Sequence, residues 1–139
     1  MINTKNNETL IYILNGSPRK NWNTAKMCES FKKGAQDTGI NAEIINLYDL
    51  NYKGCYSCFA CKVKNGKSYG KCGYPDELKE ILEKVSNSEG LVFASPVYFG
   101  ELTAQMRAFM ERLLFPYMFM TKQALKFRQK NLQRQFFIP

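Results

Sequence analysis

Four cysteines are the side chains in this sequence with the clearest capacity for redox or metal chemistry. Cys55, Cys58 and Cys61 form a C-x2-C-x2-C run, and Cys72 follows further along the chain. Thiolates two residues apart can converge on one metal, and three with a distant fourth suit a 4Fe-4S cluster. A four-thiolate zinc site and free redox thiols are the alternatives.

The chain around these cysteines is rich in lysine, and basic neighbours favour the thiolate form. The lysines expected to lower the pKa of the thiols are Lys62, Lys64, Lys67 and Lys71. The sequence contains no histidine. This excludes imidazole general bases, Ser-His and Cys-His nucleophile pairs and histidine metal ligands, so other side chains, backbone groups or a cofactor must supply any chemistry.

A second candidate site is the segment GSPRKNWNT, which follows the apolar run LIYIL and precedes a helical pattern. A loop between a buried strand and a helix lies at the carboxyl edge of a parallel sheet, and the helix N-terminus attracts anions. Ser17, Asn23 and Thr24 add donors, and Arg19 adds charge. Without a P-loop lysine or a GxGxxG fingerprint, the loop suits a monophosphate such as that of FMN. The alternative is that Asn23 or Thr24 is an ordinary helix N-cap.

A third segment, SPVYFGEL, follows the third predicted strand. Pro96 and Gly100 shape a turn, while Tyr98 and Phe99 offer flat aromatic surface beside backbone amides. Such a loop suits a flavin ring, which needs polar partners at its edge and apolar cover on its faces. Packing of Tyr98 and Phe99 in the core is the alternative.

Alternating strands and helices position these segments. Continuous apolar runs predict buried strands at residues 10–14 and 91–95, and a further strand is predicted at 42–50. A helix is predicted at 24–38, with Met27, Phe31 and Ala35 on its buried face and Cys28 packing beside them. A strand-helix alternation of this kind is typical of a doubly wound parallel α/β sheet.

Two more helices and a last strand complete the pattern. Asp76 is expected to cap a helix with Leu78, Ile81, Leu82 and Val85 on one side. A helix after SPVYFG places Leu102, Met106, Phe109 and Leu113 together. Residues 115–131 are predicted to form a long excursion, and LQRQFFIP is predicted to form a fourth strand. The strand order of the predicted sheet is then 2-1-3-4.

These three motifs, in this order, make the chain resemble the flavodoxin-like NAD(P)H-dependent FMN reductases, including their iron–sulfur flavoprotein branch. The likeness spans about residues 9 to 116. It implies a flavodoxin-like fold with bound FMN and electron transfer from NAD(P)H to a quinone, a flavin or another small acceptor. It further implies phosphate contacts from Ser17, Arg19, Asn23 and Thr24. The residues implied for the ribityl chain and ring are Pro96, Val97, Tyr98, Phe99 and Gly100.

The sequence departs from that family in two ways. Trp22 stands where a small residue is usual, and the chain reaches Pro139 without the family's fifth strand. We therefore expect one flavodoxin-like domain over residues 1–139, incomplete at its C-terminus. Two further hypotheses stay open: a metal-binding or thiol redox module with a vestigial flavin site, and an inactive truncated protein.

Charge and hydropathy narrow the partners. The net charge is +8, and the basic residues after the last acid are Arg112, Lys122, Lys126, Arg128, Lys130 and Arg134. We interpret them as a solvated face rather than a nucleic-acid site, because no nucleic-acid-binding motif accompanies them.

No apolar run approaches the roughly 18 residues of a membrane span. A cytoplasmic location is expected, and the cysteine segment and FPYMFM (residues 115–120) are candidates for contacts in a homodimer or higher oligomer.

Overall fold

A computed structural model describes residues 10–120, 125–127 and 135–138 of the chain. The main sheet contains β1 (Leu10–Asn15), β2 (Asn41–Asn46), β3 (Gly90–Ala94) and β6 (Gln135–Ile138). The α-helices of the described residues are α1 (Asn23–Asp37), α2 (Leu78–Ser86) and α3 (Ala104–Leu114). A separate antiparallel hairpin pairs β4 (Met118–Met120) with β5 (Leu125–Phe127).

The four strands of the main sheet are parallel and lie in the order β2-β1-β3-β6. This confirms the predicted flavodoxin-like order, and β6 is the strand predicted in LQRQFFIP. Residues 132–134 and 139 of that segment lie outside the described residues. The excursion predicted at 115–131 contains a 3-10 helix at Phe115–Tyr117 and then the β4–β5 hairpin, while 121–124 and 128–131 also lie outside the description.

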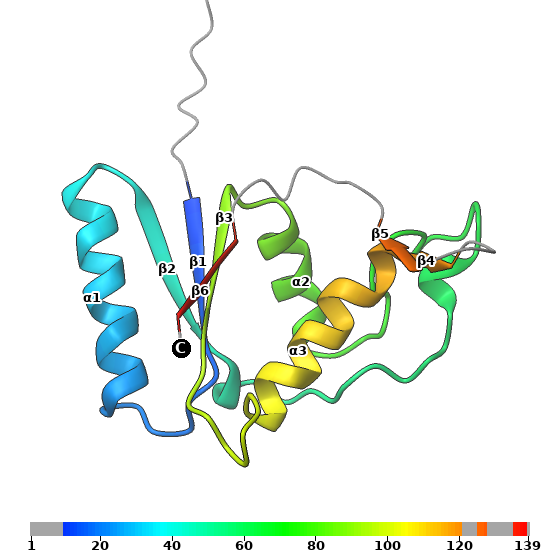
Figure 1. Ribbon diagram of the computed structural model, residues 1–139. Coiled ribbons are helices and arrows are strands. Elements are labelled where there is room, and N and C mark those ends of the chain that lie inside the picture. Colours follow the sequence, from blue (N-terminus) through cyan, green and yellow to red (C-terminus); the bar gives the residue numbers. More distant parts are fainter. Residues whose placement is uncertain (1–9, 121–124, 128–134, 139) are drawn as a thin grey trace, which may run out of the picture.

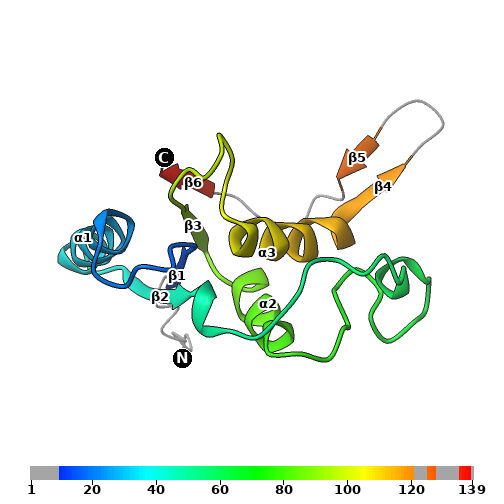
Figure 2. The same cartoon turned by 90° about the horizontal axis from the view of Figure 1, so that it is seen from below.

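Helices cover both faces of the sheet: α1 packs on one, and α2 and α3 pack on the other (Figures 1 and 2). Successive strand residues alternate between these layers. Ile13 and Val92 are fully buried in the cluster that contains Cys28 of α1. Leu14 and Phe93 belong to the opposite cluster, with α2 and α3. The continuous apolar runs of β1 and β3 are therefore explained by burial on both faces.

The buried face of α1 differs from the predicted one by a small rotation. Met27 is 42% exposed, whereas Cys28 is completely buried. Phe31 and Ala35 pack beside Cys28 as partly buried residues. Residues 28, 31 and 35 follow the i, i+3, i+7 spacing of one helix face, so Cys28 takes the central place that was predicted for Met27. The prediction that Cys28 packs in the core is confirmed.

The second predicted strand is shorter than expected. β2 ends at Asn46, and Leu47–Asp49 form a 3-10 helix. Leu47 is fully buried in the cluster between the sheet and α2–α3. The chain turns at this point because the Leu47 side chain enters that cluster, and the prediction of a strand to residue 50 was wrong in its last four residues.

The buried Cys28 thiol gives a prediction about alkaline stability. Burial, with a smaller contribution from Glu29, raises the pKa of Cys28 from 9.0 to about 11. Because the folded pKa exceeds the unfolded one, this stabilisation is complete below pH 9 and is lost as the pH rises through 11. The difference corresponds to about 2–3 kcal/mol. Urea unfolding across this range should show a larger loss in the wild type than in Cys28→Ala, because other groups such as Cys61 and Tyr12 also have raised pKa values, and equal slopes in both would contradict the role of Cys28.

Candidate functional site

The loop between β1 and α1 is shaped by polar side chains at its start. Asn15 is only 2% exposed, and its side-chain nitrogen donates to Oδ1 of Asn46 at 2.9 Å. Oδ1 of Asn15 accepts the Ser17 N–H at 3.0 Å, and Oγ of Ser17 accepts the Arg19 N–H at 3.2 Å. The Ser17 hydroxyl is thus buried and bonded within its own loop, which gives it a role in shaping the turn. Its predicted contact with a phosphate stays a prediction.

The two predicted loops are joined directly at the carboxyl edge of the sheet. The Gly16 N–H donates to the carbonyl of Ala94 at 2.8 Å, and the Gly16 carbonyl accepts from Oγ1 of Thr103 at 2.8 Å. The Thr103 N–H in turn donates to Oγ of Ser95 at 3.1 Å. A Cβ at position 16 would lie 3.0 Å from Cβ of Met106 and 3.1 Å from Oγ1 of Thr103, so a larger residue would have to push these neighbours away. The loops therefore lie side by side, as the strand order predicts.

The second loop ends in an exposed aromatic turn. Tyr98 and Glu101 exchange backbone hydrogen bonds of 2.9 and 3.0 Å around Phe99 and Gly100. Both central residues have positive φ, 52° at Phe99 and 79° at Gly100, as in the primed turns of hairpins. Phe99 is fully exposed, Val97 is 66% exposed and Tyr98 is 42% exposed. The alternative of core packing is therefore wrong, and these side chains offer apolar surface at the sheet edge.

The N-terminus of α1 adjoins the first loop. Trp22 occupies the N-cap position without a side-chain cap hydrogen bond, and Asn23 and Thr24 are the first helical residues. The alternative that Asn23 or Thr24 is the N-cap is therefore wrong. The first turn of α1 contains no acidic residue, so the positive end of the helix dipole is not offset there.

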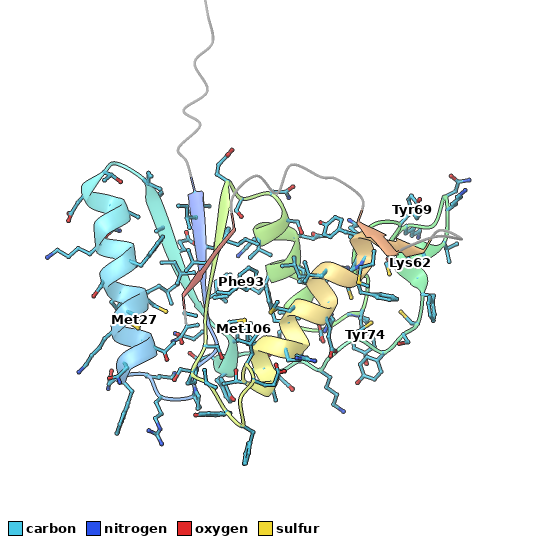
Figure 3. All side chains as sticks on the ribbon, viewed as in Figure 1. Met27, Lys62, Tyr69, Tyr74, Phe93 and Met106 are labelled. Atoms are coloured by element: carbon cyan, nitrogen blue, oxygen red, sulfur yellow. The ribbon has the colours of Figure 1, made fainter. Side chains whose placement is uncertain are left out.

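The cysteine segment, residues 51–76, is fastened to α3 at the end of the molecule remote from α1 (Figures 1 and 2). Tyr52 donates its hydroxyl to the Gln105 carbonyl at 2.7 Å, and the Cys55 N–H donates to Oε2 of Glu111 at 3.2 Å. Further on, the Lys62 ammonium donates to the carbonyls of Phe115, Pro116 and Met118. Figure 3 shows Lys62, Tyr69 and Tyr74 together at this end.

Arg112 is the buried centre of this attachment. Its side chain is 1% exposed and forms a two-point ion pair with Asp76, in which Nη2 lies 2.9 Å from Oδ1. Nε donates to Sγ of Cys72 at 3.4 Å, and the guanidinium also donates to the carbonyls of Lys53 and Tyr74. Burial is the largest single effect and lowers the pKa of Arg112, but the hydrogen bonds and charges of Asp76 and Cys72 together outweigh it, so the net shift is upward. The guanidinium thus contacts four residues of the cysteine segment and holds its two ends together.

All four candidate cysteine ligands line one pocket. Its other walls are mainly aromatic, with Tyr56, Phe59, Tyr74 and Phe115 beside Cys55, Cys58, Cys61 and Cys72. The backbone is left-handed at Ser57 and Phe59, and the Ser57 N–H donates to Sγ of Cys55 at 3.4 Å. As the side chains stand, however, no three Cys, Asp or Glu residues in the described part of the chain are close enough to hold a metal ion. The thiols share a pocket without converging.

The lysines near Cys61 do not give this thiol the lowered pKa that the sequence predicts. Burial raises the pKa of Cys61 and outweighs the lowering effect of Lys62. Lys62 itself is bonded to backbone carbonyls, and Lys71 forms an ion pair of 3.0 Å with Glu83. The prediction that lysines lower the thiol pKa is therefore wrong for Cys61.

Two structurally decisive residues were missed or misread from the sequence. Thr103, which joins the loops, is fully buried, and its position as N-cap of α3 was the available signal. Arg112 was grouped with the solvated basic face, which is wrong because it is buried and paired. Its position one residue before Leu113 and three after Phe109, within the apolar stripe of α3, was the only hint. Phe93 of β3 and Met106 of α3 lie in the apolar layer between the sheet and α3 (Figure 3).

Comparison with known proteins decides the family. A family model described as NADPH-dependent FMN reductase matches residues 9–130. The chain belongs to this family. An iron-sulfur flavoprotein of Methanocaldococcus jannaschii is 35% identical over 99 residues, which are 71% of this chain and 49% of the relative. One from Archaeoglobus fulgidus is 34% identical over 102 residues, 73% of this chain and 44% of the relative. The chain thus spans about half the length of these curated relatives.

Solved structures share the fold of this chain. An FMN-dependent NADH-azoreductase from Bacillus anthracis matches with a TM-score of 0.62 at 15% identity, covering 93% of this chain and 67% of the other. An NAD(P)H:quinone oxidoreductase from Methanothermobacter marburgensis gives 0.59 at 19% identity, covering 76% and 53%. These likenesses confirm the flavodoxin-like fold. Every helix in the described part of the chain is too short or too polar to cross a lipid bilayer.

The residues present fit the cofactor of the family at the sheet edge. The first loop and the uncapped α1 N-terminus offer a place for a phosphate, and the exposed Tyr98 and Phe99 offer cover for a flat ring. A cluster is compatible with the donor set, since four thiols face one pocket. Binding one would require their side chains to turn toward a common point.

Proposed function

We propose that this chain is an FMN-binding NAD(P)H-dependent oxidoreductase that passes electrons to a quinone, a flavin or another small acceptor. The observation that carries the proposal is the junction of Gly16 with Ala94 and Thr103, which presents the phosphate loop and the aromatic turn at one sheet edge. Membership of the FMN reductase family supports it. FMN supplies the chemistry when bound, accepting hydride from the nicotinamide and releasing electrons to the acceptor.

The residues of this chain would bind and orient the cofactor. Arg19, Asn23 and Thr24 lie at the α1 N-terminus, where charge and helix N–H groups favour a phosphate. The segment Pro96–Gly100 supplies backbone amides for the polar edge of the ring and side chains for its face. No side chain is required as acid or base, which agrees with the absence of histidine.

Flavin titration of the full chain tests the proposal. Purified protein should bind FMN with one site per chain, and it should then oxidise NADH or NADPH when a quinone acceptor is added. Comparison of the two nicotinamides identifies the preferred donor. A chain that fails to bind added FMN under these conditions would overturn the proposed activity for this chain.

The shared cysteine pocket supports a second function, a metal-binding or thiol redox module. Iron with acid-labile sulfide in anaerobically purified protein would assign a 4Fe-4S cluster, and zinc would assign a structural metal. Cys58→Ala should abolish either metal, since Cys58 faces the pocket. Cys28→Ala is the matched control, because Cys28 lies in the core on the other side of the sheet. If Cys58→Ala holds as much metal as the wild-type protein, the pocket is excluded as the metal site.

We further propose that the protein works in the cytoplasm as a homodimer or higher oligomer. The segment FPYMFM is a weaker candidate for contacts between subunits than the sequence indicates. Pro116 is buried, and Tyr117 is only 7% exposed and donates its hydroxyl to Oγ of Ser86. Exposed Phe99 and Tyr98 are the better candidates for a contact that completes the flavin site. Sedimentation of the FMN-loaded protein measures the state.

Phe99 yields a prediction that separates binding from folding. It is fully exposed at φ 52°, a conformation that costs a side-chain-bearing residue about 1–2 kcal/mol and glycine almost nothing. Phe99→Gly should therefore leave the free energy of unfolding unchanged or raise it by up to about 1 kcal/mol, while weakening FMN binding. Gly100→Ala is the control, because φ there is 79° and no atom lies within 4 Å of the added Cβ. It should lower stability by about 1 kcal/mol through backbone strain alone.

A further inference from the structure

Trp22 is an exposed aromatic side chain at a position where the fold has no need of one. It is the only tryptophan of the chain, and 59% of it is exposed. It occupies the N-cap of α1 without capping the helix. The Arg19 guanidinium lies over its ring, 4.5 Å from the ring centroid. The exposed indole therefore lies against the Arg19 side chain.

The charges around the first loop are not equivalent. The Lys20 ammonium is paired with the Asp49 carboxylate at 2.7 Å, so its charge is largely offset. Among the described residues, Arg19 forms no ion pair with a carboxylate and has the Trp22 ring as its neighbour instead. Stacking on an aromatic face holds a guanidinium without neutralising it. Arg19 thus keeps its full positive charge beside the first turn of α1.

The backbone of Arg19 is already held in place, so only its side chain remains to be positioned. The Arg19 N–H donates to Oγ of Ser17 at 3.2 Å, and Ser17 is itself fixed by Asn15. A free arginine side chain carries roughly 2 kcal/mol of rotamer entropy, part of which is lost whenever it binds an anion. Contact with an indole restricts the side chain before the anion arrives, which is the general benefit of preorganisation.

We propose that Trp22 is a positioning residue that holds the Arg19 guanidinium at the α1 N-terminus for the phosphate of FMN. It thereby makes the site prefer the phosphorylated flavin over riboflavin. The proposal rests on FMN binding as the proposed function, and it adds a residue that acts through Arg19 rather than by touching the cofactor. Its effect should therefore depend on the phosphate and on Arg19.

Titrations of FMN and of riboflavin into the full chain, followed by flavin fluorescence, test this. Trp22→Leu should weaken FMN binding about two- to fivefold, the equivalent of an exposed cation–π contact, and leave riboflavin binding unchanged. Trp22→Phe keeps an aromatic face and should restore most of the loss. In Arg19→Gln, the further change Trp22→Leu should have no additional effect, because the two residues act as one unit. Far-UV circular dichroism checks that each variant folds.

The wild-type chain offers an independent readout. Inorganic phosphate alone should change the Trp22 emission, and the change should vanish in Arg19→Gln. Equal weakening of FMN and riboflavin in Trp22→Leu would overturn the inference, since the indole would then contact the ring. Tighter FMN binding would also overturn it, because Trp22 would be holding Arg19 away. Either of these two results would leave FMN binding as the proposed function. If the wild-type protein binds neither FMN nor phosphate, both the proposed function and this inference are wrong.

Discussion

Replacement of Arg112 by methionine is expected to lower the free energy of unfolding by about 3–5 kcal/mol, because removing one partner of a buried ion pair leaves the other charge uncompensated. Arg112 is 1% exposed and Asp76 is 14% exposed, so water can solvate little of the remaining carboxylate. The carbonyls of Lys53 and Tyr74 and the sulfur of Cys72 lose donors at the same time. Urea unfolding measures the loss.

Arg107→Met is the matched control on the same helix. Arg107 also pairs with a carboxylate, that of Glu101 at 3.0 Å, but the two side chains are 59% and 68% exposed. An exposed pair contributes about 0–1 kcal/mol, so the control should change stability little. The cysteine segment should respond as well: alkylation of Cys72 should quicken in Arg112→Met, while that of the core residue Cys28 should not. Equal stability losses in the two variants would contradict the role of Arg112.

Replacement of Thr103 by alanine is expected to lower the free energy of unfolding by about 2–4 kcal/mol and to weaken FMN binding. The variant loses the N-cap of α3, worth about 1 kcal/mol, and leaves the Gly16 carbonyl without its donor, worth about 1–3 kcal/mol more. The hydroxyl is fully buried, so no water replaces it. The FMN effect follows because the bond from Thr103 to Gly16 joins the two loops that we propose bind the cofactor.

Two variants separate the hydroxyl from its surroundings. Thr103→Ser keeps the oxygen and should retain most of the stability and of the FMN affinity. Thr38→Ala removes a similar bond, Oγ1 to the Ala35 carbonyl at 2.7 Å, but at the exposed end of α1, so it should cost less than about 1 kcal/mol. Full FMN affinity in Thr103→Ala would show that the loops keep their places without this bond.

The sequence was sufficient for the parts of the fold that local pattern determines. β1 and β3 read as buried strands because both of their faces are covered by helices, and the loops that follow them were located correctly because each ends such a strand. The phase of α1 was missed by one residue because the prediction followed the four-residue spacing of Met27, Phe31 and Ala35, whereas the packed face contains Cys28, Phe31 and Ala35. In the structure it is the smaller side chain that fits against Ile13 and Val92.

The arrangement of the cysteine segment was beyond local pattern. Its anchor joins Arg112 to Asp76 across 36 residues of sequence, and nothing in the composition near either residue identifies the pair. Asp76 was expected only as a helix cap. The N-cap position of α2 belongs to Glu77, although Oδ1 of Asp76 accepts the Leu78 N–H at 3.2 Å. The same carboxylate also compensates the buried guanidinium. Long-range pairing of this kind depends on tertiary structure, which periodicity does not encode.

Helix α3 contacts two separate regions of the protein: the loops after β1 and β3, and the cysteine segment. Thr103 at its start holds the two loops proposed to bind FMN, while Glu111 and Arg112 near its end hold the cysteine segment. An α-helix turns about 100° per residue, so one inserted or deleted residue between these points would swing the second set of contacts away from the first. Exposed positions such as Arg107 can vary freely in identity, yet the number of residues from Thr103 to Arg112 is constrained. Insertions and deletions in this helix should therefore be rejected during the evolution of any lineage that retains both regions.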